Sequence, residues 1–296
     1  ATKFCMEVVE SLADFWDFTD PFVDFWRGLF KLPDDMMRLS ICLIVTYPAV
    51  LLHRFVMPGT KARLVFSLFV GLFWAFFCFK WEALYYVGTG LFTYLACWLL
   101  PSKHCPRIVV VVSFAVLSYG HWTRFQYHYL VYYINWCTPM MLFCIKLQSF
   151  AWNVHDGQKP PSKIFPAKNR IEKLPSLLEY FSWLFFFAGF LTGPVGEFQD
   201  YISFTDRSMF KAEPNGQIPN SWKPAFQKFL WMFVGIFGFY GAKLLPESYC
   251  GSLEFLEHPF WYRMIYLLFA VELGFTKYYF AWFNGEAHTI LIGAAY

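Results

Sequence analysis

The seven histidines are the side chains of this chain best suited to proton transfer, because imidazole titrates near neutral pH. Their spacing, however, matches no metal site or catalytic pair. His121 and His128 lie seven residues apart, whereas ligand pairs on a helix usually lie three or four residues apart with acidic companions. We expect His53 and His104 at the membrane interface. His155 either caps a helix C-terminus or lines a polar gate at a substrate entrance.

Sequence motifs for common hydrolytic, phosphate-binding and zinc chemistry are absent. The chain contains no GxSxG, GxxxxGK[ST], HExxH or CxxC pattern, so a hydrolase elbow, a P-loop, a zincin site and a zinc ribbon have no support. The eight cysteines follow no redox or metal spacing either. The sequence therefore predicts no catalytic residue and no metal ligand among these groups.

Charged residues inside apolar segments are stronger candidates for a functional role. Lys146 lies about eight residues from each end of its segment, too deep to reach water easily. We expect it to face the protein interior and to meet Glu179, Glu272 or an anionic ligand. Glu272 and Lys277 are five residues apart, about 140° around a helix, so each needs another partner.

The segment 174–200 combines a charged start with a break near its end. Ser176 and Glu179 fit a helix capping box, which we favour over a site role for Glu179. Gly189, Gly193 and Pro194 allow close helix packing, which we favour over shaping of a ligand tunnel.

Composition indicates an integral membrane protein that crosses the bilayer several times. Hydrophobic residues make up 57% of the chain and charged residues only 15%, against about 25% charged residues in soluble proteins. The net charge of +3 is too small to indicate a nucleic-acid partner. We predict an all-α protein with about eight transmembrane helices, at 37–57, 62–79, 83–100, 108–119, 139–154, 174–200, 225–245 and 260–283.

The remaining segments complete this predicted organisation. Residues 1–35 are expected to form amphipathic helices at the membrane surface, and residues 36–296 a transmembrane domain. The aromatic stretch 120–137 is expected to be interfacial or re-entrant, and a further helix is expected to begin at Glu286. The basic connection 156–173 predicts a cytoplasmic side shared with Arg54 and Arg107, with Lys80 opposite.

Several segments, taken in order, resemble the lysophospholipid acyltransferase branch of the membrane-bound O-acyltransferase family. The resemblance runs from about residue 35 to residue 296. It rests on Trp136-x-x-Pro139, Lys146, Val154-His155-Asp156-Gly157, Pro175-Ser176-Leu177-Leu178-Glu179-Tyr180-Phe181-Ser182, Ala188-Gly189-x-x-x-Gly193-Pro194 and Lys277-Tyr278-Tyr279-Phe280-Ala281-Trp282.

This resemblance implies a multi-pass enzyme of the endoplasmic reticulum membrane that transfers a fatty acyl group from acyl-CoA to a lysophospholipid hydroxyl. Acyl-CoA would be a co-substrate, no cofactor is implied, and a membrane-protein complex is possible. The family's essential residues occur in motifs like WNxxT and WHG, which are absent here and would fall beyond Tyr296. We therefore expect substrate-binding roles only, for Trp136, Lys146, Asp156, Glu179, Gly193, Pro194, Glu272, Lys277 and Trp282. The alternative is a noncatalytic subunit or scaffold that keeps the first part of the fold.

Overall fold

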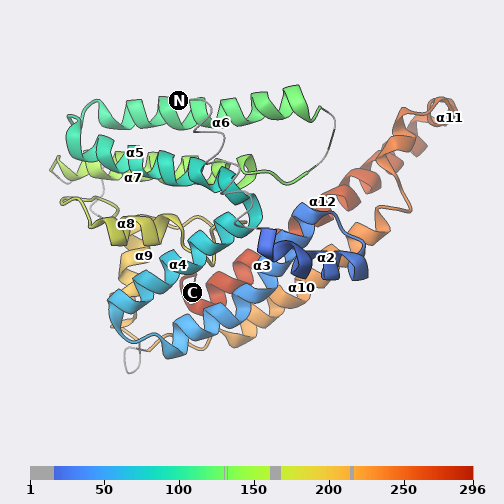
Figure 1. Ribbon diagram of the computed structural model, residues 1–296. Helices are drawn as coiled ribbons and strands as arrows, with labels where there is room; N and C mark the ends of the chain where they lie inside the picture. The colour runs from blue at the N-terminus through green and yellow to red at the C-terminus, as the bar shows by residue number, and fades with distance from the viewer. Residues whose placement is uncertain (1–16, 130, 132, 161–167, 214–216, 296) are drawn as a thin grey trace.

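Helices form all the regular structure in the described part of the chain (Figure 1). The computed structural model describes residues 17–129, 131, 133–160, 168–213 and 217–295, which confirms the predicted all-α class. The elements are η1 (Asp17–Thr19), α2 (Asp20–Phe30), α3 (Asp34–Leu51), η2 (Leu52–Val56), α4 (Gly59–Phe79), η3 (Lys80–Ala83), α5 (Leu84–Leu99), α6 (Cys105–Tyr127), α7 (Cys137–Gly157), α8 (Leu177–Leu184), α9 (Phe198–Thr205), η4 (Ser208–Phe210), α10 (Trp222–Gly241), η6 (Glu247–Gly251), α11 (Leu253–Glu257) and α12 (Phe260–Ile292).

The longest apolar helices are long enough to cross a bilayer. Among the described residues, four helical stretches meet this condition by length and composition: Asp34–Val56, Gly59–Leu99, Cys105–Tyr127 and Phe260–Ile292. The second stretch contains α4 and α5, which turn at Lys80, a residue with a φ of 48°. The predicted count of about eight spanning helices is not confirmed.

Three predicted boundaries are wrong. Helix α6 continues through the aromatic stretch to Tyr127 instead of ending at residue 119. Helix α12 continues to Ile292, so Glu286 lies inside it and begins no new helix. The segment 174–200 is not one span, because α8 ends at Leu184 and α9 begins only at Phe198.

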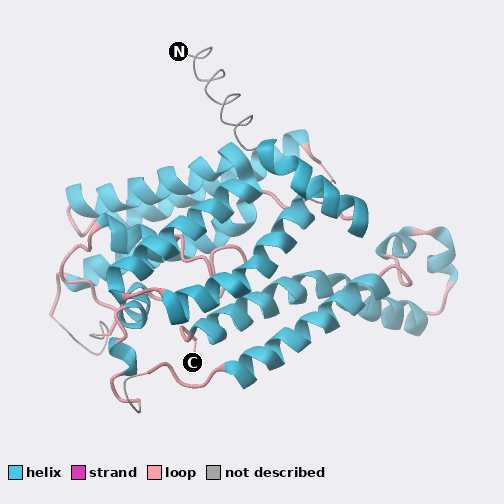
Figure 2. Cartoon of the chain, turned by 60° about the horizontal axis from the view of Figure 1, so that its bottom comes forward, coloured by secondary structure: helices cyan, strands magenta, loops and turns pink. Residues whose placement is uncertain are grey.

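Two groups of helices make up the molecule (Figure 1). Helix α6 packs on α5 and α7, while α10 pairs with α12 along its length. Gly235 and Gly238 make this second pairing possible: a Cβ on Gly238 would lie 2.3 Å from Thr276 Cγ2. These small residues let α10 and α12 approach each other closely. Figure 2 shows the far end of the α10–α12 pair extending away from the other helices.

An ion pair between Arg38 of α3 and Asp20 docks the N-terminal helix α2 onto α3. The Arg38 side chain is 2% exposed and pairs with Asp20 and, at 2.8 Å, with Asp34. It also donates to the Phe77 carbonyl at 3.0 Å, which ties in the end of α4. Phe22 and Phe25 remain exposed on α2, so this part is amphipathic as predicted. Its place at a membrane surface and the domain boundary at residue 35 stay predictions, and residues 1–16 lie outside the described residues.

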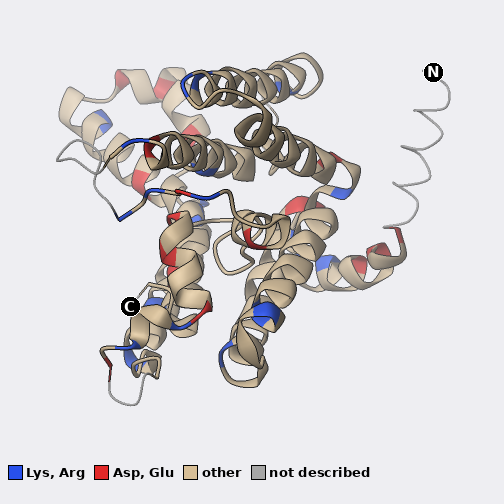
Figure 3. Cartoon of the chain, turned by 90° about the vertical axis from the view of Figure 1, so that its left-hand side faces the viewer, with Lys and Arg blue, Asp and Glu red and all other residues tan. Residues whose placement is uncertain are grey.

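The basic connections lie together at one end of the helices. Figure 1 shows the α3–α4, α5–α6 and α7–α8 connections at the same end, and Figure 3 views that end with Lys and Arg in blue. The turn at Lys80 lies at the opposite end. Residues 161–167 of the predicted basic connection lie outside the described part. The elements that hold Arg54 and Arg107, η2 and the start of α6, thus lie at one end and η3 (Lys80–Ala83) at the other, and the side that faces the cytoplasm stays a prediction.

Candidate functional site

A row of polar side chains on α7 faces the segment that follows α8. Lys146, Ser149 and Asn153 recur at three and four residues and share one helix face; we call them the α7 polar stripe. The Lys146 side chain is 5% exposed, and its Nζ donates to the carbonyls of Trp183 at 2.8 Å and Leu184 at 3.2 Å. These carbonyls end α8, where a cation complements the helix dipole.

Lys146 therefore faces the protein interior, as predicted, but not the predicted partners. Its Nζ also lies 5.1 Å from the centre of the Trp183 ring. The expected carboxylates are elsewhere: Glu179 lies at the start of α8, and Glu272 is exposed on α12. Main-chain carbonyls take their place because α8 ends against the middle of α7.

Glu197 completes the partners of the α7 polar stripe. Ser149 Oγ donates to Glu197 Oε2 at 2.7 Å, and Asn153 Nδ2 donates to the same oxygen at 2.8 Å. Glu197 immediately precedes α9, so these bonds join α7 to α9. Our reading of the sequence missed Ser149 and Asn153, although their spacing from Lys146 along one helix face is a signal that could have found them.

The start of α8 confirms the capping role of Glu179. The Glu179 carboxylate accepts the Ser176 backbone N–H at 2.8 Å, and Ser176 Oγ accepts the Glu179 N–H at 3.3 Å. This reciprocal pair satisfies two main-chain donors at the helix start. Glu179 therefore holds the N-terminus of α8, while Lys146 holds its C-terminal end.

The turn at Gly193 and Pro194 lies against α12. Gly193 has a φ of 80°, which favours glycine, and the peptide bond to Pro194 is cis. A Cβ at Gly285 of α12 would lie only 2.2 Å from the Gly193 carbonyl oxygen. The favoured packing role of Gly193 is thus supported by a direct contact with another helix.

Buried polar groups continue along the last turns of α12. Asn284 is fully buried and His288 is 1% exposed. The Tyr47 hydroxyl of α3 donates to Asn284 Oδ1 at 3.1 Å, and its ring centre lies 4.4 Å from that of His288. Among the described residues His288 Nε2 has no hydrogen-bond partner. Because His288 is buried, only a ligand bound inside the protein could contact this nitrogen.

His53 is not interfacial as expected, because its side chain is fully buried. Its ring stacks on Phe204 with centres 5.7 Å apart and lies about as close to Phe66 and Phe187, at 6.1 and 6.0 Å. Neither ring nitrogen has a partner within the described part of the chain. Packing of α9 over the end of α3 encloses this histidine.

The other predicted site residues are spread over the molecule. Trp136 starts α7 and stacks on Tyr85 with ring centres 4.3 Å apart, while Asp156 lies in the last turn of the same helix. On α12, Glu272 accepts the Tyr279 hydroxyl at 3.1 Å, Lys277 Nζ lies 5.2 Å from the Tyr278 ring centre, and Trp282 is 52% exposed. The structure brings Lys146 to the C-terminal end of α8, while Glu272, Lys277 and Trp282 lie on α12 and make contacts within that helix.

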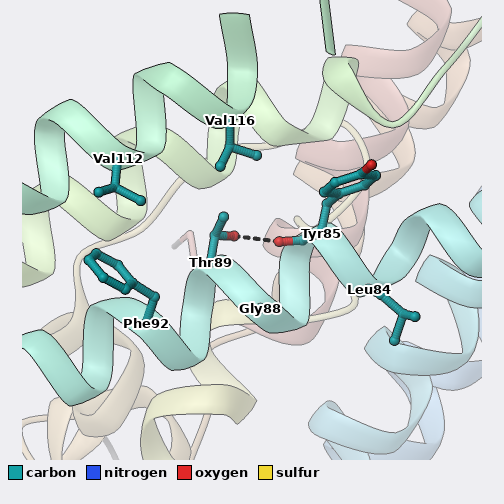
Figure 4. A pocket seen from close by; sticks show the side chains of 7 residues that line it. All are labelled: Leu84, Tyr85, Gly88, Thr89, Phe92, Val112 and Val116. Carbon is teal, nitrogen blue, oxygen red and sulfur yellow. Dashed lines mark hydrogen bonds between the residues drawn. The ribbon is translucent and has the colours of Figure 1, made fainter. Parts of the chain in front are cut away.

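An apolar groove lies between α5 and α6 (Figure 4). Thr89 lines this groove, and its hydroxyl donates to the Tyr85 carbonyl at 2.7 Å. The groove offers apolar contact and no acid, base or cation. Its lining residues are Leu84, Tyr85, Gly88, Thr89, Phe92, Val112 and Val116. No group of three or more potential metal ligands occurs among the residues that the structure describes.

Comparison with known proteins identifies relatives along nearly the whole chain. A lysophospholipid acyltransferase of Schizosaccharomyces pombe is 27% identical over 285 residues, covering 92% of this chain and 55% of that protein. The membrane-bound glycerophospholipid O-acyltransferase 2 of Gallus gallus is 27% identical over 278 residues, covering 87% and 54%. The human lysophospholipid acyltransferase 5 is 27% identical over 277 residues, covering 89% and 54%.

The chain thus spans about half the length of the curated relatives it matches. The sequence profile of the membrane-bound O-acyltransferase family matches residues 123–296, which is more than half of the chain. This match includes α7 with its polar stripe, both ends of α8, and α12. The chain belongs to the membrane-bound O-acyltransferase family.

Proposed function

We propose that this protein transfers a fatty acyl group from acyl-CoA to the free hydroxyl of a lysophospholipid in the endoplasmic reticulum membrane. The observation that carries the proposal is the similarity to proteins named lysophospholipid acyltransferase over 89–92% of this chain. The apolar helices and the groove between α5 and α6 suit lipid substrates. The partners of the protein are then membrane lipids, acyl-CoA and the lysophospholipid.

The described residues would build the walls of the reaction chamber. Attack of a hydroxyl on a thioester needs a general base at that hydroxyl, and the WNxxT and WHG motifs are not in these 296 residues. The contribution of this chain is positional: Lys146 fixes the end of α8, and Gly285 seats α12 on the turn at Gly193.

An acyl-incorporation assay tests the proposal. Microsomes that contain the complete native polypeptide receive a labelled acyl-CoA and lysophospholipids of several head groups. We expect labelled phospholipid above the empty-vector level, with a requirement for both substrates. Gly285→Ala should lower the rate because its Cβ would meet the Gly193 carbonyl, whereas Gly28→Ala on α2, whose Cβ meets nothing within 4 Å, should leave it unchanged.

The same preparation separates acyl transfer from the noncatalytic alternative. A folded protein that incorporates no label with any head group contradicts the proposal. Stoichiometric copurification with a larger membrane complex, in the absence of incorporation, would establish the role of subunit or scaffold. A tagged protein located outside the endoplasmic reticulum would contradict the proposed location alone.

A further inference from the structure

Three arginines meet where α3, α4 and α9 come together. Arg54 lies in η2, Arg63 in the first turn of α4, and Arg207 between α9 and η4; we call them the arginine cluster. Arg207 Nη2 donates to the Arg54 carbonyl at 3.2 Å, and Arg63 Nη1 donates to the Thr205 carbonyl at 2.5 Å. Residues far apart in the sequence are thus joined through main-chain acceptors.

The arginine cluster brings three positive charges together, and the acid whose charge acts on Arg63 is Asp206. Among the described residues, none of these three arginines forms an ion pair within 4 Å. Burial lowers the pKa of Arg207 to about 10, and repulsion by Arg63 and Arg54 adds to this effect. Like charges held together in a partly buried place disfavour the folded state unless an anion binds between them.

The backbone at Arg207 carries a second cost. Its φ of 68° lies in the left-handed region that side chains other than glycine avoid. Such strain is retained where the surrounding structure holds a residue for a purpose, which is common at ligand sites. In addition, Arg63 Nε is buried and has no partner within the described part of the chain. Arg63 thus has a donor without an acceptor, and Arg207 is held beside it in a strained conformation.

Exposed aromatic rings beside the cluster indicate that it lies at the membrane surface. Phe55 is 64% exposed and Trp222 is 48% exposed, and their rings stack with centres 6.5 Å apart. They flank Arg54, whose Nη1 donates to Ser221 Oγ at 2.5 Å. Aromatic side chains of this kind concentrate at the level of lipid head groups, where basic residues meet phosphates.

We propose that Arg63 and Arg207, supported by Arg54, bind the phosphate of an anionic phospholipid head group. Guanidinium groups suit this ligand because they present paired N–H donors to phosphate oxygens. Arg54 itself holds the start of α10 and the end of α12 through Pro219, Ser221 and Leu291. It is the supporting residue, and Arg63 and Arg207 supply the donors.

Binding to the purified native polypeptide in nonionic detergent tests this site. Thermal unfolding is measured during titration with phosphatidic acid, phosphatidylcholine or inorganic phosphate. We expect saturable stabilisation by phosphatidic acid, and a loss of affinity on the order of tenfold or more in Arg63→Gln/Arg207→Gln. Lys61→Gln removes a charge from an exposed neighbouring position and should bind as the wild type does.

Three outcomes would overturn the proposal. Equal affinity for inorganic phosphate would assign the site to a soluble anion rather than a lipid. Unchanged binding in the double variant, or an equal loss in Lys61→Gln, would show unspecific attraction.

If the double variant does not fold, Arg207→Gln alone carries the test. Arg63→Lys/Arg207→Lys keeps both charges and should retain part of the affinity. Thermal unfolding measures lipid binding without turnover. A negative result in the acyl-transfer assay therefore leaves this test valid.

Discussion

The α7 polar stripe and the arginine cluster both hold positive charge within an apolar protein, but they balance it differently. Lys146 donates to two carbonyls, and Ser149 and Asn153 both donate to Glu197. In the cluster, Arg63 and Arg207 donate to carbonyls of the main chain, and the charge of Asp206 acts on Arg63 without forming an ion pair within 4 Å. The first region holds one cation with two acceptors, whereas the second holds three cations that repel one another, with Asp206 as the acid that acts on Arg63.

This difference separates a structural role from a binding role. Buried polar groups that have partners fix the positions of the helices that carry them. A group that keeps unmatched charge or a strained backbone is costly to the folded state, and a ligand offsets that cost. We therefore expect substitutions in the α7 polar stripe to lower the stability of the protein. Substitutions in the arginine cluster should leave that stability unchanged or raise it.

The largest effect is expected for Lys146→Met. Methionine fills a similar volume but leaves the Trp183 and Leu184 carbonyls without a donor, at about 1–3 kcal/mol for each buried group. The melting temperature of the purified protein measures this loss. Lys223→Met, at an exposed position of α10, is the matched control and should change little. An equal melting temperature for both variants would break the comparison.

Glu197→Ala should have the next largest effect. The substitution removes the acceptor shared by Ser149 and Asn153 and should destabilise the protein by about 1.5–3 kcal/mol, as expected for hydrogen bonds to a charged group. Chemical denaturation in detergent would report the change. Glu213→Ala removes an exposed acid from the following loop as the control. A loss confined to Glu213→Ala would contradict the assigned role of Glu197.

A smaller effect is expected at the start of α8. Ser176→Ala removes the hydroxyl that accepts the Glu179 N–H and should cost about 1 kcal/mol. Hydrogen exchange of the α8 amides should increase while exchange in α12 stays the same. Uniformly faster exchange would mean that Ser176 supports more than its own helix.

The smallest effect, and one of opposite sign, is expected for Arg207→Gly. Glycine adopts the φ of 68° without strain and removes one of three like charges, but it loses the hydrogen bond to the Arg54 carbonyl. We expect a gain of about 0.5 kcal/mol in the unfolding free energy. Thermal unfolding without added lipid measures it. A marked loss of stability would place the arginine cluster in the same class as the α7 polar stripe.

Helix positions could be predicted from the sequence because long apolar runs leave few alternatives in a bilayer. The runs 37–57 and 62–79 correspond closely to α3 with η2 and to α4. Glu179 was also predictable, since a capping box is a local pattern. These features depend on residues close together in the chain.

The partners of buried charges could not be predicted in this way. Lys146 meets carbonyls 37 and 38 residues away, and a carbonyl leaves no mark in the sequence because every residue carries one. The enclosure of His53 likewise depends on Phe204 of α9, which folds back over the end of α3. Contacts between distant segments decide both cases.

The contacts between α3 and α12 also have a consequence for biogenesis. Tyr47 donates to Asn284 and Arg54 donates to the Leu291 carbonyl, and each pair is separated by 237 residues. At ribosomal rates the later partner is synthesised roughly 10–50 s after the earlier one. Throughout this interval a nascent chain at the translocon carries a phenol and a guanidinium without their final acceptors. Membrane insertion factors and quality control therefore meet an incomplete polar interior before α12 arrives.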